Sequence, residues 1–194
     1  MKLAKALWSL GSFLVNGTII VYIFLSSKAP ANLEERFAYI NENWGIYNAH
    51  WKIEFLLMTM VAIGAFYFAI KSKKISWSLI TIGQLVLLMI YPLMLGGYHN
   101  NPIDLAKMIN QIATIIFVFG NIIFLSGLFV LYIKDNILKP WLRYTAVAFA
   151  SIEVLVLLFV FADVLTWQQT MVTAPLVNVL YLINAYYGLK LKME

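Results

Sequence analysis

Long apolar stretches dominate this chain, and their length limits what it can fold into. An α-helix needs about 20 mostly apolar residues to cross the hydrocarbon core of a bilayer. Six stretches meet or approach that length and fill most of the 194 residues: 6–26, 53–70, 75–95, 105–133, 141–165 and 172–189. None shows the alternation of a barrel strand. The sequence therefore predicts an all-α, polytopic integral membrane protein, a six-transmembrane-helix bundle that forms one domain over residues 1–194.

The composition excludes the soluble alternatives. Hydrophobic residues make up 62% of the chain and charged residues 12%, against about 45–50% and about 25% in soluble globular proteins. A soluble domain of this size could not bury so much apolar surface, which excludes a soluble enzyme, a disordered chain and a cytosolic nucleic-acid-binding protein. The chain has no cysteine, so disulfides, Cys-ligated metal sites and thiol nucleophiles are excluded too. The predicted surroundings are a lipid bilayer.

The basic residues predict how the bundle is oriented, because lysine and arginine are enriched in cytoplasmic loops. If the N-terminus is cytoplasmic, ten of the fourteen basic residues fall on the inner side. The outer side then holds Lys28, Arg36, Lys52 and Lys107. We therefore expect both termini inside, in the cytoplasmic (inner) membrane of a bacterium.

Tryptophan and proline give further local predictions. Tryptophan favours the two membrane interfaces, which predicts Trp8, Trp77 and Trp141 at the inner interface and Trp44, Trp51 and Trp167 at the outer one. Proline inside a helix removes a backbone hydrogen bond. Pro92 should therefore kink the third apolar stretch.

The longest predicted loop, residues 27–52, contains a short amphipathic helix at about residues 32–44. Asn32 and Glu35 have the spacing of a capping box. The apolar residues that follow recur on one helical face: Leu33, Phe37, Ile40 and Trp44. We expect this helix to lie on the outer membrane surface, either as a simple connector or as a lid over a cavity.

Polar side chains inside the apolar stretches need an explanation, because a polar group in hydrocarbon costs free energy unless it finds a partner. Five stretches carry one near mid-depth: Asn16, Gln84, Asn121, Glu153 and Asn178. Glu153 is the most informative, since it can be charged. It shares a helical face with Ala146 and Ala150, and small-residue faces are where membrane helices pack. Glu153 should therefore point into the bundle.

Two interpretations of this polar set are open. The five residues can form a site for a small molecule or a proton, with Glu153 as the titrating group. That interpretation predicts a small-molecule-binding or transport-type bundle. Alternatively, Glu153 is protonated and bonded inside a packed bundle, which is typical of a non-catalytic structural or accessory subunit in a homo-oligomer or with a membrane partner. A lipid-facing seam of Ala113, Gly120 and Gly127 would favour this alternative.

A third hypothesis is a metal-assisted membrane hydrolase at the outer rim. Two imidazoles and a carboxylate could hold zinc with an open position for water, and the candidate ligands there are His50, Glu54, His99 and Asp163. Their spacing matches no known metal signature, and the chain has no nucleotide, dinucleotide or haem motif. The sequence therefore favours no metal, no cofactor and no catalytic activity.

Overall fold

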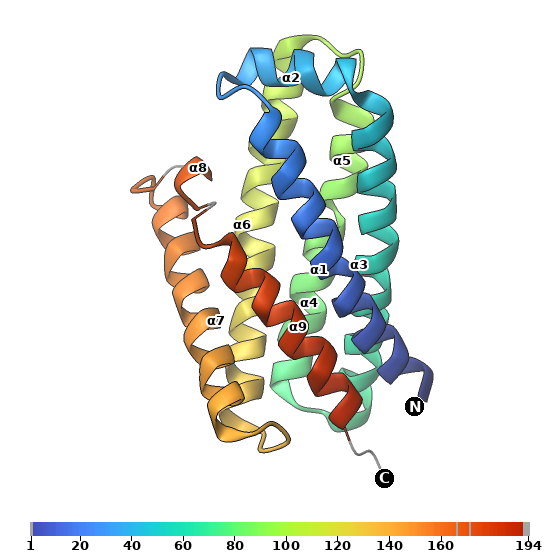
Figure 1. Ribbon diagram of the computed structural model, residues 1–194, viewed down its shortest axis with the longest axis vertical. Coiled ribbons are helices and arrows are strands. Elements are labelled where there is room, and N and C mark those ends of the chain that lie inside the picture. Colours follow the sequence, from blue (N-terminus) through green and yellow to red (C-terminus); the bar gives the residue numbers. More distant parts are fainter. Residues whose placement is uncertain (1, 166, 171, 192–194) are drawn as a thin grey trace.

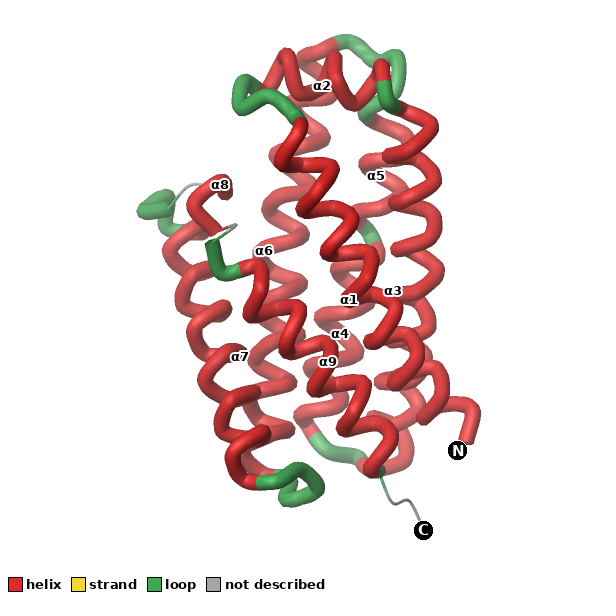
Figure 2. Tube along the Cα trace, in the orientation of Figure 1, coloured by secondary structure: helices red, strands yellow, loops and turns green. Residues whose placement is uncertain are grey.

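The computed structural model describes residues 2–165, 167–170 and 172–191, and the secondary structure in these ranges is helical throughout (Figures 1 and 2). In chain order the helices are α1 (Lys2–Lys28), α2 (Leu33–Glu42), α3 (Trp44–Ser72), α4 (Ile75–Leu88), α5 (Ile90–Gly97), α6 (Ile103–Lys134), α7 (Pro140–Phe161), α8 (Trp167–Thr170) and α9 (Ala174–Lys190).

The helix lengths agree with a multi-pass membrane protein. Within the described residues, five stretches are long and apolar enough to cross a bilayer: α1, α3, α4 together with α5, α6, and α7. The apolar helix α9 has 17 residues, which correspond to about 26 Å at 1.5 Å per residue. That is slightly less than a hydrocarbon core of about 30 Å. The predicted all-α class is confirmed, with five to six helices able to span a membrane.

Six helices form a closed ring in which each contacts the next: α1, α3, α4, α6, α7, α9 and again α1. Helix α5 continues α4 and also contacts α6. In this order α3 and α7 occupy opposite sides of the ring. Both termini lie at one end of the bundle, here named the terminal end, and α2 crosses the opposite end, named the α2 end (Figure 1).

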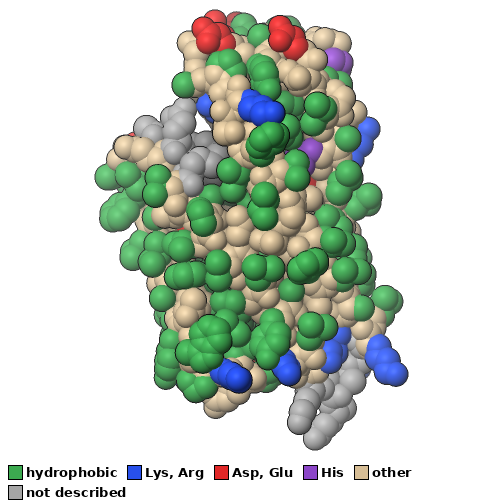
Figure 3. Space-filling view, in the orientation of Figure 1, with side chains coloured by type: hydrophobic (Ala, Val, Ile, Leu, Met, Phe, Trp, Pro, Cys, Tyr) green, Lys and Arg blue, Asp and Glu red, His purple; other side chains and the backbone are tan. Residues whose placement is uncertain are grey.

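Charged side chains are unequally distributed between these two ends. In Figure 3 acidic side chains lie at the α2 end and basic side chains lie at both ends, while hydrophobic side chains cover much of the face between them. The helix bounds place nine of the ten residues predicted inside at the terminal end; the tenth, Lys192, lies outside the described residues. The charge asymmetry that motivated the predicted orientation is therefore built into the fold.

Two helix ends lie several residues away from the predicted span boundaries. Helix α3 begins at Trp44 rather than at residue 53, because polar residues such as His50 and Lys52 lower the hydropathy of its first turns without breaking the helix. Helix α7 ends at Phe161 rather than at residue 165. There the chain turns through Asp163, whose φ of 56° lies in the left-handed region and cannot continue a right-handed helix.

The predicted amphipathic helix exists as α2, with Asn32 as its N-cap. The Asn32 side chain accepts hydrogen bonds from the backbone N–H groups of Glu34 and Glu35. Trp44, however, starts α3 instead of continuing α2. Phe37 and Ile40 are buried, and the Phe37 ring meets the Tyr98 ring edge-on at 5.0 Å. The apolar face of α2 therefore packs on the end of the bundle.

The helix is interrupted close to Pro92, where a kink was expected. Helices α4 and α5 are separated at Met89, close to Leu88, whose carbonyl group would receive the hydrogen bond that Pro92 cannot donate.

An aromatic cluster fills the terminal end of the ring, and we name it the aromatic plug: Trp8, Phe68, Trp77, Tyr132 and Tyr187, all buried. Trp77 lies 5.0 Å from the Trp8 ring and 4.7 Å from the Phe68 ring. The Trp8 indole N–H donates to the Asn184 carbonyl oxygen at 2.9 Å. Trp8 and Trp77, and likewise Trp51, are thus core residues packed between helices. The side chain of Trp167 lies outside the described part.

The predicted small-residue seam lies inside the chain, between α6 and α4. A Cβ atom on Gly127 would lie 2.7 Å from the Ile80 backbone nitrogen, and one on Gly120 would lie 2.8 Å from the Leu87 side chain. Ala113 is buried as well. Because this seam closes the ring itself, it offers no lipid-facing surface to a partner subunit.

Candidate functional site

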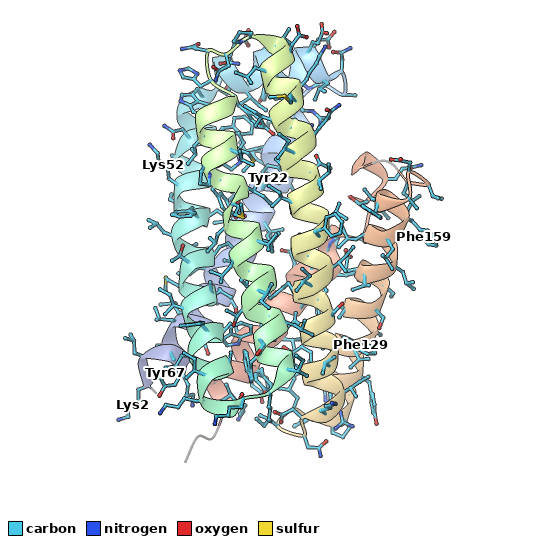
Figure 4. All side chains as sticks on the ribbon, turned by 180° about the vertical axis from the view of Figure 1, so that it is seen from behind. Lys2, Tyr22, Lys52, Tyr67, Phe129 and Phe159 are labelled. Carbon is cyan, nitrogen blue, oxygen red and sulfur yellow. The ribbon has the colours of Figure 1, made fainter. Side chains whose placement is uncertain are left out.

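A cavity of about 220 Å³ lies inside the ring, on the α2 side of the aromatic plug. Every helix of the ring contributes to its wall, as do α5 and α8. Most of the lining is aliphatic or aromatic, and the aromatic members are Tyr22, Trp51, Tyr91, Phe117 and Tyr181. Figure 4 shows Tyr22 in the interior of the bundle, whereas Lys52 and Phe159 point away from it.

Glu153 reaches this cavity from α7, as its helical face predicts. Its side chain is only 5% exposed, and Ala146 and Ala150 on the same face are fully buried. Thr173, next to the start of α9, is a side-chain hydrogen-bond partner. That hydroxyl also lies 2.9 Å from the Thr170 carbonyl oxygen, and its single hydrogen can serve only one acceptor. The Oε1 atom of Glu153 has no hydrogen-bond partner among the described residues.

A second carboxyl group, that of Glu54, reaches the same cavity from α3. Its Oε1 atom lies 3.2 Å from the Thr18 hydroxyl, and Tyr91 is a second side-chain hydrogen-bond partner. The Thr18 hydroxyl is also 2.9 Å from the Val15 carbonyl oxygen. Each acid is therefore served by a threonine whose one hydrogen is shared with a backbone carbonyl group.

Among the described residues, neither acid is paired with a lysine or an arginine. The described residues that line the cavity include no lysine, arginine or histidine. Within the described ranges, the only ion-pair contact of either acid is with His50, whose Nε2 atom lies 3.6 Å from Glu54 Oε2, too far for a hydrogen bond. A carboxylate removed from water costs several kcal/mol unless it is protonated or meets a cation.

The structure brings only part of the predicted polar set together. Asn121 lines the cavity with Glu153, and its amide nitrogen donates to the Phe117 carbonyl oxygen at 3.0 Å. Asn16, Gln84 and Asn178 do not line it. Gln84 is fully buried beside Tyr181, and the side-chain oxygens of Asn16 and Asn178 are buried too.

The metal-site candidates do not converge. His99 stacks on Trp44 with ring centroids 4.6 Å apart, and its Nδ1 atom lies 3.2 Å from the Asn41 side-chain oxygen. Asp163 is exposed in the turn after α7. In the part of the chain that the structure describes, no three histidine, cysteine, aspartate or glutamate residues are grouped to hold a metal ion.

The cavity role of Glu54 is what reasoning from the sequence missed, since it treated this residue as part of an outer rim. The predicted span starts at residue 53, whereas α3 starts at Trp44. Glu54 lies ten positions after Trp44, about 15 Å along the helix from its first residue. The His50–Glu54 spacing on one helical face was the signal available, and it led instead to the hypothesis of a metal site at the outer rim.

Comparison of the chain with protein-family models, with curated proteins and with solved structures gives no match.

Proposed function

We propose that this protein is a multi-pass membrane protein that binds a small molecule in the cavity between Glu54 and Glu153, in the manner of a transport-type helical bundle. One observation carries the proposal: two carboxyl groups from opposite sides of the helix ring reach a single apolar cavity. Convergence of a few polar groups in an apolar cavity is typical of ligand sites.

The burial of these acids supports binding over a purely structural role. A packed bundle would pair buried acids with donors from neighbouring helices, because half-satisfied buried polar groups are costly. Here both acids adjoin open space. Glu54 has donors from two neighbouring helices, Thr18 of α1 and Tyr91 of α5, but Glu153 keeps a carboxyl oxygen without a partner among the described residues. A lipid-facing seam would have favoured an accessory subunit. Gly120 and Gly127 instead pack against α4, inside the chain.

The proposal includes a direction of access. With six crossings and both termini in the cytoplasm, the cavity lies in the outer half of the bilayer. The aromatic plug then separates it from the cytoplasm. Passage of a ligand through the bundle would require this plug to open, which the Trp8–Asn184 and Tyr187–Asp135 hydrogen bonds, at 2.9 and 2.7 Å, oppose.

Thiol accessibility tests the proposal without background labelling, because the chain has no cysteine. Ala174 lines the cavity, whereas Ala146 is fully buried on the packed face of α7. Each is replaced by cysteine and treated, in the folded protein in proteoliposomes, with small water-soluble methanethiosulfonate reagents. We expect A174C to react and A146C to stay unmodified.

The exposed loop position Ala31 supplies the reference rate, as an A31C variant. If A174C reacts no faster than A146C while A31C is modified fully, the interior is closed to water-soluble molecules. In that case the binding proposal is wrong, and Glu153 is a packing residue.

A further inference from the structure

The cavity combines two acids with a mostly apolar wall, and this combination constrains the chemistry of its ligand. The described part of the lining has no basic side chain that could receive an anion. Glu153 is buried, aims into the cavity and has a carboxyl oxygen without a hydrogen-bond partner among the described residues. A ligand that complements this site carries positive charge.

We infer that the cavity binds a monovalent organic cation with an apolar body, such as a lipophilic amine or a quaternary ammonium compound. The positive centre lies between Glu54 and Glu153, and the apolar body lies against the aromatic and aliphatic wall. This inference rests on the proposed function and adds the substrate class to it.

The aromatic residues support an organic cation in particular. The faces of tyrosine, tryptophan and phenylalanine attract ammonium groups within about 6 Å of the ring centre, and five such residues line the cavity. The space is sufficient too, because an apolar cavity of about 150 Å³ already admits benzene, and this one measures about 220 Å³.

A bare metal ion fits the site less well. Calcium takes six to eight oxygen ligands and magnesium demands octahedral geometry. Within the described residues, the carboxyl groups facing the cavity are those of Glu54 and Glu153, and the rest of the wall is mostly apolar. An organic cation instead needs charge on one side and apolar contact around it.

Benzyltrimethylammonium is a suitable probe, because its charge is permanent and its ring matches the aromatic wall. Binding to the purified full-length protein is measured by isothermal titration calorimetry, with phenylmethanesulfonate as an anion of similar shape. We expect the cation to bind and the anion not to.

The isosteric variants E54Q and E153Q should each weaken cation binding at least about tenfold, the equivalent of about 1.4 kcal/mol. E42Q, which removes an exposed acid of α2, is the matched control and should bind as the parent does.

A second measurement covers the case in which a glutamine variant fails to fold. The A174C protein, with both acids intact, is modified by a cationic and by an anionic methanethiosulfonate reagent, and each rate is divided by the corresponding rate of A31C. We expect the normalised cationic rate to be at least about tenfold higher, and benzyltrimethylammonium to slow it.

The possible outcomes distinguish failure of the cation assignment from failure of the proposed function. Equal normalised rates for the two reagents, or equal binding of the two probe ions, would overturn the cation assignment and leave the cavity as a ligand site. Cation binding that is unchanged in folded E54Q and E153Q would also overturn it. No modification of A174C by either reagent would overturn both the cation assignment and the proposed function.

Discussion

At the residue scale, the close approach of α4 and α6 depends on glycine. Gly83 faces the backbone of α6, where an added Cβ atom would overlap the backbone nitrogen and Cα of Phe124. The overlap is with main chain, which cannot rotate away as a side chain can. Sequence reasoning identified the glycines on the α6 side of this contact, Gly120 and Gly127, but not Gly83 on the α4 side.

We therefore expect G83A to destabilise the protein by about 1–3 kcal/mol, the usual cost of inserting a methyl group into a packed interior. Gly17 is the matched control, because nothing lies within 4 Å of a Cβ atom built there. G17A should be neutral or stabilising by up to about 1 kcal/mol, since alanine favours a helix over glycine. The free energy of unfolding of the two variants, measured by reversible unfolding in detergent, checks this. Equal effects of G83A and G17A would contradict the close approach of Gly83 to α6.

At the element scale, α2 is held across the bundle by its apolar face, by hydrogen bonds between Asn41 and residues 98–100, and by one ion pair. The Lys107 ammonium group lies 2.5 Å from Glu34 Oε1. Its hydrogen bond and its charge hold the pKa of the Glu34 carboxyl group below the usual value of 4.5. Since no residue of α2 lines the cavity, this helix caps the bundle end rather than the ligand space.

Because the pKa of Glu34 is lowered in the folded state, the ion pair stabilises the packing of α2 more at neutral than at acidic pH. This stabilisation is fully present above the ordinary pKa of 4.5 and is lost as the pH falls through the lowered folded-state value. We expect the amides of α2 to exchange hydrogen faster near pH 3 than near pH 6, after correction for intrinsic rates. The effect should be small, because Glu34 is exposed and surface pairs contribute little. E34Q should abolish the difference, and a difference that persists in E34Q would assign it to another group.

At the scale of the whole molecule, the ring places both termini and most basic residues at one end. An even number of crossings follows if α9 spans the bilayer with α1, α3, α4–α5, α6 and α7. Helix α9 is the shortest of these, and Lys5 of α1 donates to the Leu191 carbonyl oxygen beyond its end at 2.7 Å. This contact anchors the end of α9 beside the start of α1.

Topology can be tested in intact cells with the cysteine-free chain. A31C, in the loop at the α2 end, should react with a membrane-impermeant thiol reagent. S72C, exposed at the end of α3 near the terminal end, should react only after the cells are permeabilised. A cysteine introduced at Leu189, also exposed at the terminal end, should behave as S72C does. Labelling at residue 189 from outside would show that α9 does not cross.

The sequence by itself determined the fold class, the approximate spans and the charge asymmetry. The length of an apolar stretch and the charge of a loop are local properties that do not depend on which helices pack together. It also predicted that Glu153 faces inward, since Ala146 and Ala150 mark the packed side of one helix. The tertiary structure alone decided that Glu54 faces the same cavity as Glu153, and that Trp8 and Trp77 are core residues. Those facts depend on which helices are neighbours in the ring, and the periodicity of a single helix carries no information about its partners.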